Sequence, residues 1–268
     1  MIREPAVAGH FYPANPHELG EYVRSFYSPD RSLLAAMGIV APHAGYPYSG
    51  AVAGAIYSAV QLPRRFIILG PNHTGRGAAL SLHPGGEWRT PLGPAAVDDE
   101  LNRRIVQECK GVALDSQAHS REHSIEVQIP FLQEARKQDL GFAAICVGTA
   151  DYDSLISLGH GLARVIQAMP DPVLLVASSD MSHFETAKIA AEKDSSAIEK
   201  MLGLDPKGLY RTIIEKKVSM CGFAPAVAVL TACVDLGATA GRLIRYANSG
   251  DVSGDYHRVV GYAGIAIV

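Results

Sequence analysis

The sequence predicts an α/β fold in which helices cover both faces of a central sheet. Strand-like runs alternate with helix-like segments along most of the chain, which is the order of elements in α/β proteins. The middle runs, such as 173–178 (VLLVAS), are continuously apolar, as expected of strands buried on both faces. Because no repeat, low-complexity tract or linker divides the 268 residues, we expect a single domain over residues 1–268.

The first half of the chain contains short apolar runs that end at proline or glycine. We expect, in order, a strand at 38–42, a helix at 50–61, a strand at 65–70 and paired strands at 78–82 and 87–92. The helix is predicted from its small residues, and Pro63 follows its end. Pro71 ends the strand RFIILG because proline has no N–H for the next ladder bond. The paired strands flank HPGG at 83–86, a sequence typical of a turn.

The second half continues the alternation of helices and strands. We expect, in order, helices at 98–110 and 121–137, a strand at 142–147, a helix at 153–169, a strand at 173–178, helices at 185–202, 206–217 and 224–236, and closing strands at 242–247 and 258–268. The first of these helices begins with acidic residues, which favour the positive end of the helix dipole. The helix at 153–169 has apolar residues three or four positions apart, the spacing of an amphipathic helix. Pro130 is expected to kink or shorten the helix at 121–137.

The composition argues against several classes of function. The chain has 48% hydrophobic and 19% charged residues and a net charge of −3, an ordinary globular profile. It has no run of lysine or arginine, so we expect neither nucleic acid nor a membrane as a partner. The N-terminal MIREPAVAGHFYP lacks the pattern of a signal peptide, and no apolar stretch is long enough for a membrane span. The four cysteines lie far apart without a CxxC pair, which favours free thiols in the reducing cytoplasm.

Polar side chains follow three of the expected buried strands. His43 lies in APHAGYPYSG, His73 in LGPNHTG, and Asp180 and His183 in SSDMSHF. In an open α/β sheet, the loops at the carboxyl ends of neighbouring strands meet in one crevice where ligands bind. If the three strands are neighbours, these four groups therefore point into one cleft.

Cys221 is a further candidate, because it directly precedes the helix expected at 224–236. The positive end of a helix dipole stabilises a thiolate, which favours metal binding or nucleophilic attack. Together, His43, His73 and Cys221 would give one transition metal two neutral imidazoles, one anionic ligand and open coordination positions. A thiolate favours softer metals such as Cu(I) and Zn(II) without excluding iron.

His183 and Asp180 are expected beside this ligand set. We expect His183 to act as an acid or base, with Asp180 orienting it or accepting its ring proton. Taken alone, each candidate has an ordinary structural explanation. A histidine after a strand is commonly a turn or core residue, a cysteine a small buried hydrophobe, and Asp180 a helix cap. The metal hypothesis therefore depends on these residues meeting in space.

The segment AHSREHSIEVQIPFL supplies further candidates for the lining of the pocket. If it is helical from Arg121 onward, His123 and Glu126 lie on one face, and His119 lies at the mouth of the pocket. Tyr46, close to His43 in sequence, is also expected to line it. An exposed first helical turn would explain the polar residues of the segment equally well.

Seven segments, in order along nearly the whole chain, point to a known family. They are AVAGHFYP, PHAGYPYSG, LGPNHTG, WRTPLG, EHSIEVQIPFL, SSDMSH and CGFAP. Each is modest evidence alone, but the ordered set is specific. It resembles the Memo (mediator of cell motility) family, whose prokaryotic branch is called AmmeMemoRadiSam system protein B.

The resemblance implies a fold like that of class III extradiol dioxygenases, a three-layer α/β/α sandwich with a mixed central sheet. By motif, it places the family's metal-binding pair of histidines and cysteine at His43, His73 and Cys221, and the dioxygenase acid–base histidine at His183. Those dioxygenases have a glutamate where this chain has Cys221. Members of the family are linked to copper or iron binding and redox chemistry, and the eukaryotic members to phosphotyrosine-peptide binding. The prokaryotic name implies radical-SAM and AMMECR-type partner proteins.

Three functional hypotheses follow from these observations. The first is metal-dependent redox or dioxygenase-like chemistry on a small substrate, with iron or copper preferred and zinc possible. The second is a non-catalytic module that binds metal and a peptide or partner protein in the same cleft. The third is a metal-free hydrolase with Cys221 as nucleophile and His183 or His43 as base.

Overall fold

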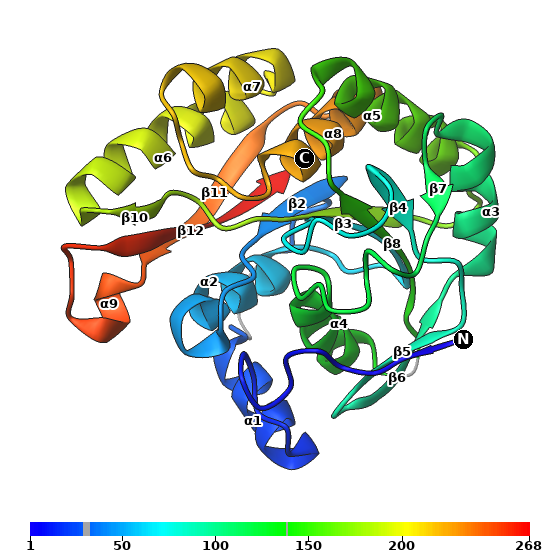
Figure 1. Ribbon diagram of the computed structural model, residues 1–268, viewed down its shortest axis with the longest axis horizontal. Helices are drawn as coiled ribbons and strands as arrows, with labels where there is room; N and C mark the ends of the chain where they lie inside the picture. The colour runs from blue at the N-terminus through cyan, green and yellow to red at the C-terminus, as the bar shows by residue number, and fades with distance from the viewer. Residues whose placement is uncertain (29–32, 138) are drawn as a thin grey trace.

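The computed structural model describes residues 1–28, 33–137 and 139–268, whose strands form one mixed sheet (Figure 1). The strands are β1 (Ile2–Arg3), β2 (Gly38–Ala41), β3 (Arg65–Pro71), β4 (Leu80–Leu82), β5 (Glu87–Thr90), β6 (Gly93–Val97), β7 (Ala113–Leu114), β8 (Gly141–Val147), β9 (Val173–Ser178), β10 (His183–Glu185), β11 (Gly241–Asn248) and β12 (Val259–Ile267). Their order is β1-β5-β6-β8-β3-β9-β2-β12-β10, with β11 paired to β12, and β4 paired to β7 and β8.

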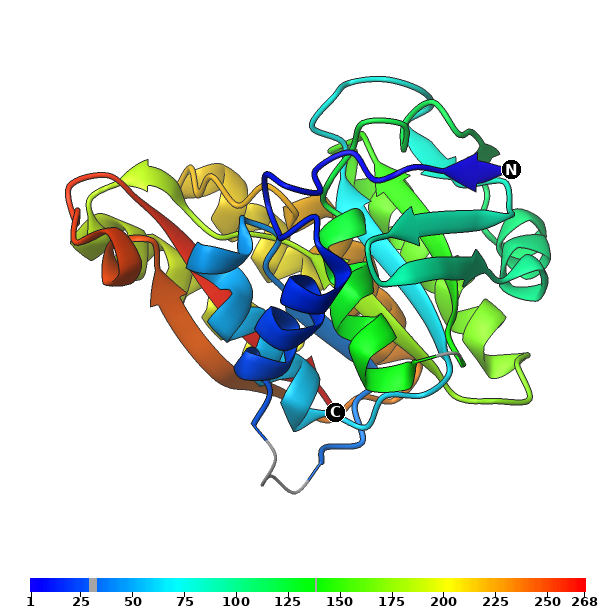
Figure 2. The same ribbon diagram turned by 90° about the horizontal axis from the view of Figure 1, so that it is seen from below.

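Helices cover both faces of this sheet. They are α1 (Pro16–Phe26), α2 (Tyr46–Ala59), α3 (Asp99–Glu108), the 3₁₀ turn η1 (Glu126–Gln128), α4 (Ile129–Arg136), α5 (Tyr152–Gln167), α6 (Ala187–Leu202), α7 (Pro206–Glu215), α8 (Phe223–Asp235) and α9 (Gly250–Ser253). One apolar core joins the sheet to α3, α5, α6, α7 and α8, and a second joins it to α1, α2 and α4. Figure 2 shows α1, α2 and α4 on their face of the sheet. The predicted α/β class is therefore confirmed, and the sheet is mixed.

The centre of the sheet is parallel and buried on both faces. β8, β3, β9 and β2 are consecutive parallel neighbours. In β3, Phe66 and Ile68 enter the core under α1, α2 and α4, whereas Ile67 and Leu69 enter the opposite core, as the two-residue period of a strand requires. Because β9 lies between β3 and β2, the carboxyl ends of all three strands meet at one edge. The expected neighbour relation is thus confirmed.

The hairpin lies one turn later than expected. β4 pairs with β7 and β8, while β5 forms its hairpin with β6 around residues 90–93. Gly93 has φ of 114°, which suits glycine at this turn. Gly86 has φ of 91°, and a Cβ there would lie 2.0 Å from the Met1 carbonyl oxygen. The HPGG segment therefore makes room for β1, which pairs with β5.

The helix expected at 121–137 begins later, with η1 at Glu126 and α4 at Ile129. The side chain of Glu122 explains this difference. Its Oε1 accepts the backbone N–H groups of His123 and Ser124, both at 2.9 Å. These two bonds hold residues 121–125 in an irregular loop. No helix in the described part of the chain combines the length and apolar character needed to cross a bilayer.

Candidate metal centre

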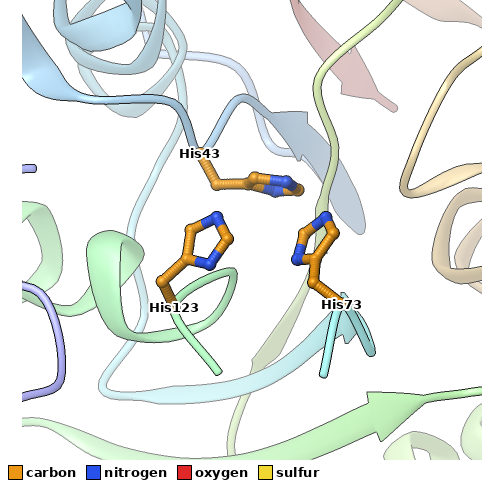
Figure 3. A group of neighbouring side chains, drawn as sticks. All are labelled: His43, His73 and His123. Carbon is orange, nitrogen blue, oxygen red and sulfur yellow. The ribbon is translucent and has the colours of Figure 1, made fainter. Parts of the chain in front are cut away.

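Three imidazoles meet at the carboxyl edge of the central strands. His43 follows β2, His73 follows β3, and His123 lies in the loop before η1. One potential ligand atom from each ring lies within 4.8 Å of those of the other two. The rings of His73 and His123 are stacked with centroids 4.7 Å apart, and both are edge-on to His43. Figure 3 shows a ring nitrogen of His73 and one of His123 pointing toward His43.

The hydrogen bonds around Ser178 fix the tautomer of His43. The Ser178 hydroxyl has one proton, which it donates to the Ser124 carbonyl at 2.5 Å. It accepts a hydrogen bond from Gln128 Nε2 at 2.8 Å, and His43 Nδ1 lies 2.9 Å away. Since the serine proton is already used, His43 Nδ1 must carry the hydrogen and donate it. The lone pair of His43 is therefore on Nε2.

The orientation of Gln128 is itself fixed. Its Nε2 donates to the Pro42 carbonyl at 2.9 Å, and its Oε1 accepts from the Tyr57 hydroxyl at 2.9 Å. A flipped amide would place an oxygen against the Pro42 carbonyl, with no proton between them. Burial also lowers the pKa of His43 well below its usual value. A positive charge on His123 or His73, when either ring is protonated, lowers this pKa further. A neutral ring with a free Nε2 lone pair is what a metal ion requires.

Glu122 fixes His73 in the same way. Its buried carboxylate accepts the His73 backbone N–H at 2.6 Å, and Oε1 lies 2.9 Å from His73 Nδ1. Because an ionised carboxylate only accepts hydrogen bonds, Nδ1 carries the proton and Nε2 carries the lone pair. Burial would raise the pKa of Glu122, but the bonds from His73 and the Ser124 backbone lower it to about 2, together with the charges that His73 and His123 carry when they are protonated. Such carboxylate–histidine pairs orient metal ligands and raise their basicity.

Cys221 contacts one of the two imidazoles expected with it. Its Sγ lies 3.2 Å from His43 Nε2 and 3.7 Å from the Asp180 carbonyl oxygen. It directly precedes Gly222, the N-cap of α8. The expected stabilisation of its thiolate by the helix is outweighed, because burial and then Asp180 raise the pKa of the thiol. Without a bound cation, Cys221 is a neutral thiol.

Asp180 and His183 both lie at this edge. The expected hydrogen bond between them is not formed, because each has other partners. Asp180 Oδ1 accepts the backbone N–H groups of His43 at 2.7 Å and Ala44 at 3.3 Å. Burial raises the pKa of Asp180. Ser219 holds His183 instead, because its carbonyl lies 2.9 Å from His183 Nδ1 and its hydroxyl accepts the His183 backbone N–H at 2.7 Å. Nδ1 therefore carries the proton, and Nε2 is free to exchange one.

Three expected pocket-lining residues have partners elsewhere. The Tyr46 hydroxyl donates to the Val127 carbonyl within an aromatic cluster under the sheet. His119 is fully buried, with Nε2 against the Ser81 carbonyl at 3.0 Å, and not at a mouth. The Glu126 carboxylate accepts hydrogen bonds from the N-terminal segment, and its Oε2 lies 2.7 Å from Nη1 of Arg3. Since residues 121–125 are not helical, His123 and Glu126 do not share a helix face, and only His123 turns to the other imidazoles.

The site opens toward solvent on one side. His43 is 2% exposed, whereas the side chains of His123 and His73 are 22% and 35% exposed. A ligand would therefore approach past His73 and His123. The donor set, with two Nε2 lone pairs, a third imidazole and the Cys221 sulfur beside His43 Nε2, suits a transition metal of intermediate softness.

The residues that fix the tautomers were not among those expected from the sequence. Glu122, Ser178 and Gln128 act on the histidines without being metal donors themselves. A weak signal exists for two of them. Ser178 is the polar last residue of the apolar run VLLVAS, and Glu122 is a carboxylate beside His123 in REHS. Gln128 gives no sequence signal, because its contacts depend on Pro42 and Tyr57, which are far away in the chain.

Comparison with known proteins gives one consistent result. A family model described as Memo-like protein matches residues 3–266. A MEMO1 family protein of Methanosarcina barkeri is 41% identical over 270 residues, covering 99% of this chain and 100% of the relative. One of Methanopyrus kandleri is 39% identical over 278 residues, covering 99% and 98%. An uncharacterized Escherichia coli K12 protein of known structure shares the fold, with a TM-score of 0.50, 15% identity, and coverage of 79% of this chain and 89% of that one.

The low pKa of Glu122 gives a testable pH dependence. Its pKa is lowered from 4.5 to about 2 in the folded protein, so its ionised form stabilises the fold above pH 4.5. That contribution is lost as pH falls from 4.5 through 2. We expect wild type to lose up to about 3 kcal/mol of unfolding free energy relative to Glu122→Gln over this range. Urea unfolding of both proteins at several pH values measures the difference, and parallel curves would contradict the assignment.

Proposed function

The chain belongs to the Memo-like family, and we propose that it is a metalloprotein that binds one transition-metal ion through Nε2 of His43 and His73. Cys221 completes the proposed ligand set as a thiolate. His123, the third ring of the cluster, lies close enough to contact the metal or its ligand. Iron or copper is the preferred metal, and zinc is compatible with the same donors.

One observation carries this proposal: both Nδ1 atoms are occupied by protein acceptors. Ser178 accepts a hydrogen bond from the Nδ1–H of His43, and Glu122 accepts one from the Nδ1–H of His73. Metal-binding histidines almost always donate their other N–H to such a partner. The protein therefore holds two lone pairs ready at one point.

Cys221 would lose its proton on metal binding. The thiol is neutral because burial raises its pKa, and a coordinating cation deprotonates a thiol outright. Its sulfur already contacts His43 Nε2 at 3.2 Å, so little movement is needed for both to bind one ion. Metal binding should consequently release a proton.

The proposed chemistry is redox or extradiol-dioxygenase-like and acts on a small substrate. The metal would supply redox and Lewis-acid chemistry at open coordination positions. His183 would move a proton through Nε2, since Ser219 holds its Nδ1. Asp180 would hold the backbone that carries His43 in place. The exposed side at His73 and His123 would admit the substrate.

A metal-free cysteine hydrolase is disfavoured by the same electrostatics. Such an enzyme needs a thiolate beside a protonated or proton-accepting imidazole. Here burial raises the pKa of Cys221 and lowers that of His43. Both shifts disfavour the thiolate–imidazolium pair, so the Cys221–His43 contact suits a metal better than a nucleophile.

The proposal also covers the cellular compartment and the partners of the protein. The described cysteines Cys109, Cys146, Cys221 and Cys233 are all free thiols, which supports the reducing cytoplasm as its compartment. We propose no nucleic-acid or membrane role. A peptide could enter the exposed side of the site in place of a small molecule, and the family resemblance suggests radical-SAM and AMMECR-type partners.

Metal content tests the binding proposal. Protein purified without an affinity tag and incubated anaerobically with Fe²⁺ should retain about one ion per chain after desalting. His43→Ala and His73→Ala should abolish retention because each removes a fixed lone pair. His160→Ala, which changes an exposed histidine paired with Asp235, and Cys233→Ala, which changes a core cysteine, should leave it unchanged. Equal metal content in all five proteins would contradict the proposed site.

Oxygen uptake tests the catalytic part of the proposal. Iron-loaded protein mixed with a catechol should consume O₂, and the metal-free protein should not. His183→Gln should lower the rate on the order of 10²-fold or more while metal content stays constant, because the variant cannot exchange the proton. If iron-loaded wild type consumes no O₂ with any catechol tried, the dioxygenase-like part of the proposal is contradicted and the non-catalytic binding module is favoured.

A further inference from the structure

Arg3 is a buried cation at the start of the chain, and its guanidinium makes an unusual set of contacts. Its Nε donates to the His119 carbonyl at 2.8 Å, one terminal nitrogen to the Glu122 carbonyl at 2.7 Å, and the other to the Glu126 carboxylate at 2.7 Å. The group lies over the Trp88 ring, 4.1 Å from the ring centroid. Three of these four partners belong to residues 119–126, which we name the clamp loop.

The clamp loop is also the segment that builds one side of the metal centre. The Glu122 side chain holds the backbone and Nδ1 of His73, while its backbone carbonyl is held by Arg3. His123 follows directly and contributes the third imidazole. Residues 121–125 are irregular, so no helix ladder fixes their backbone. The guanidinium supplies the missing restraint, because its planar fork binds the loop at separated points.

We propose that Arg3 is a positioning residue of the metal centre, acting through Glu122 on His73 and through the clamp loop on His123. The inference rests on the proposed metal-binding function. Arg3 does not contact the metal donors. It fixes the loop whose carboxylate sets the His73 tautomer, and thereby holds the Nε2 lone pair in place for an ion.

The rest of the N-terminal segment, residues 4–12, strengthens the restraint that Arg3 places on the clamp loop. The Glu126 carboxylate accepts the N–H groups of Ala6 and Val7 and the Tyr12 hydroxyl, besides Arg3. The segment continues to Phe11, whose ring lies 4.7 Å from that of His123. The Phe11 carbonyl accepts the N–H of Tyr46, three residues after His43. The segment thus bridges the loop of His43 and the clamp loop, which gives a reason for the motif AVAGHFYP.

A purely stabilising role explains this arrangement less well. A buried ion pair often contributes little net stability, because desolvation of both charges offsets their attraction. The Arg3–Glu126 pair has two additional guanidinium bonds to carbonyl groups of one loop. These bonds define where the loop lies, a property that an apolar replacement of equal size could not reproduce.

The test compares Arg3→Lys and Arg3→Gln with Arg65→Lys. Lysine keeps the charge beside Glu126 but cannot reach both loop carbonyls. Arg65 is a matched control, since it is also a mostly buried arginine, paired with Asp98, and lies at the opposite end of β3 from His73. Long-range ¹⁵N–¹H NMR of the metal-free proteins reports the His73 tautomer, and Co²⁺ titration followed by visible absorption reports affinity and coordination geometry.

In wild type and Arg65→Lys we expect the Nδ1–H tautomer of His73 and the same Co²⁺ affinity and spectrum. In both Arg3 variants we expect a mixture of tautomers, a 10- to 100-fold loss of Co²⁺ affinity and an altered spectrum.

Unchanged tautomer and affinity in the Arg3 variants would overturn the inference. It would also be overturned if both Arg3 variants failed to fold while Arg65→Lys folded, because Arg3 would then hold the fold as a whole. Absence of Co²⁺ binding by wild type would instead contradict the proposed function, while the tautomer result would still judge the role of Arg3.

Discussion

The tautomers of two histidines are fixed by buried acceptors, and the candidate site depends on this constraint. The Nδ1–H of His43 donates a hydrogen bond to Ser178, and the Nδ1–H of His73 donates one to Glu122. Each acceptor is held in turn, Ser178 by Gln128 and the Ser124 carbonyl, and Glu122 by three backbone N–H groups. Without these partners each ring could place its lone pair on either nitrogen. With them, both lone pairs face the cluster.

Glu122 shows how the local fold and the site share one cause. The same carboxylate accepts the N–H groups of His123 and Ser124, which holds the loop in an irregular conformation, and accepts a hydrogen bond from the ring N–H of His73. A helix through this loop would carry the carboxylate away from His73. The irregular loop is therefore a requirement of the site, and the N-terminal segment supplies its restraint through Arg3.

The sequence predicted the parts of the fold and the site that depend on local pattern. Apolar runs identified the central strands, and His43 and His73 stand just after two of them in the sequence. The rule that loops at the carboxyl ends of neighbouring strands meet in one crevice then predicted that these two histidines lie close together. The β5–β6 hairpin was wrongly placed because HPGG is a turn sequence whose glycines serve to admit β1. The start of the helix at 121–137 was predicted too early, because the sequence pattern does not reveal the hydrogen bonds that the Glu122 carboxylate accepts. The partnership of His183 with Ser219, rather than Asp180, depends on a contact between residues 36 positions apart, which no local pattern encodes.

We propose that the protein itself orients the Nε2 lone pairs of His43 and His73 toward one metal ion. Anomalous diffraction from a crystal grown anaerobically with Fe²⁺ tests it most directly. We expect a single strong peak bonded to Nε2 of His43 and His73 at roughly 2.0–2.1 Å, with the Cys221 sulfur at about 2.3 Å, distances on the scale of zinc sites. A peak elsewhere, or bonds through Nδ1 with Ser178 or Glu122 displaced, would contradict it.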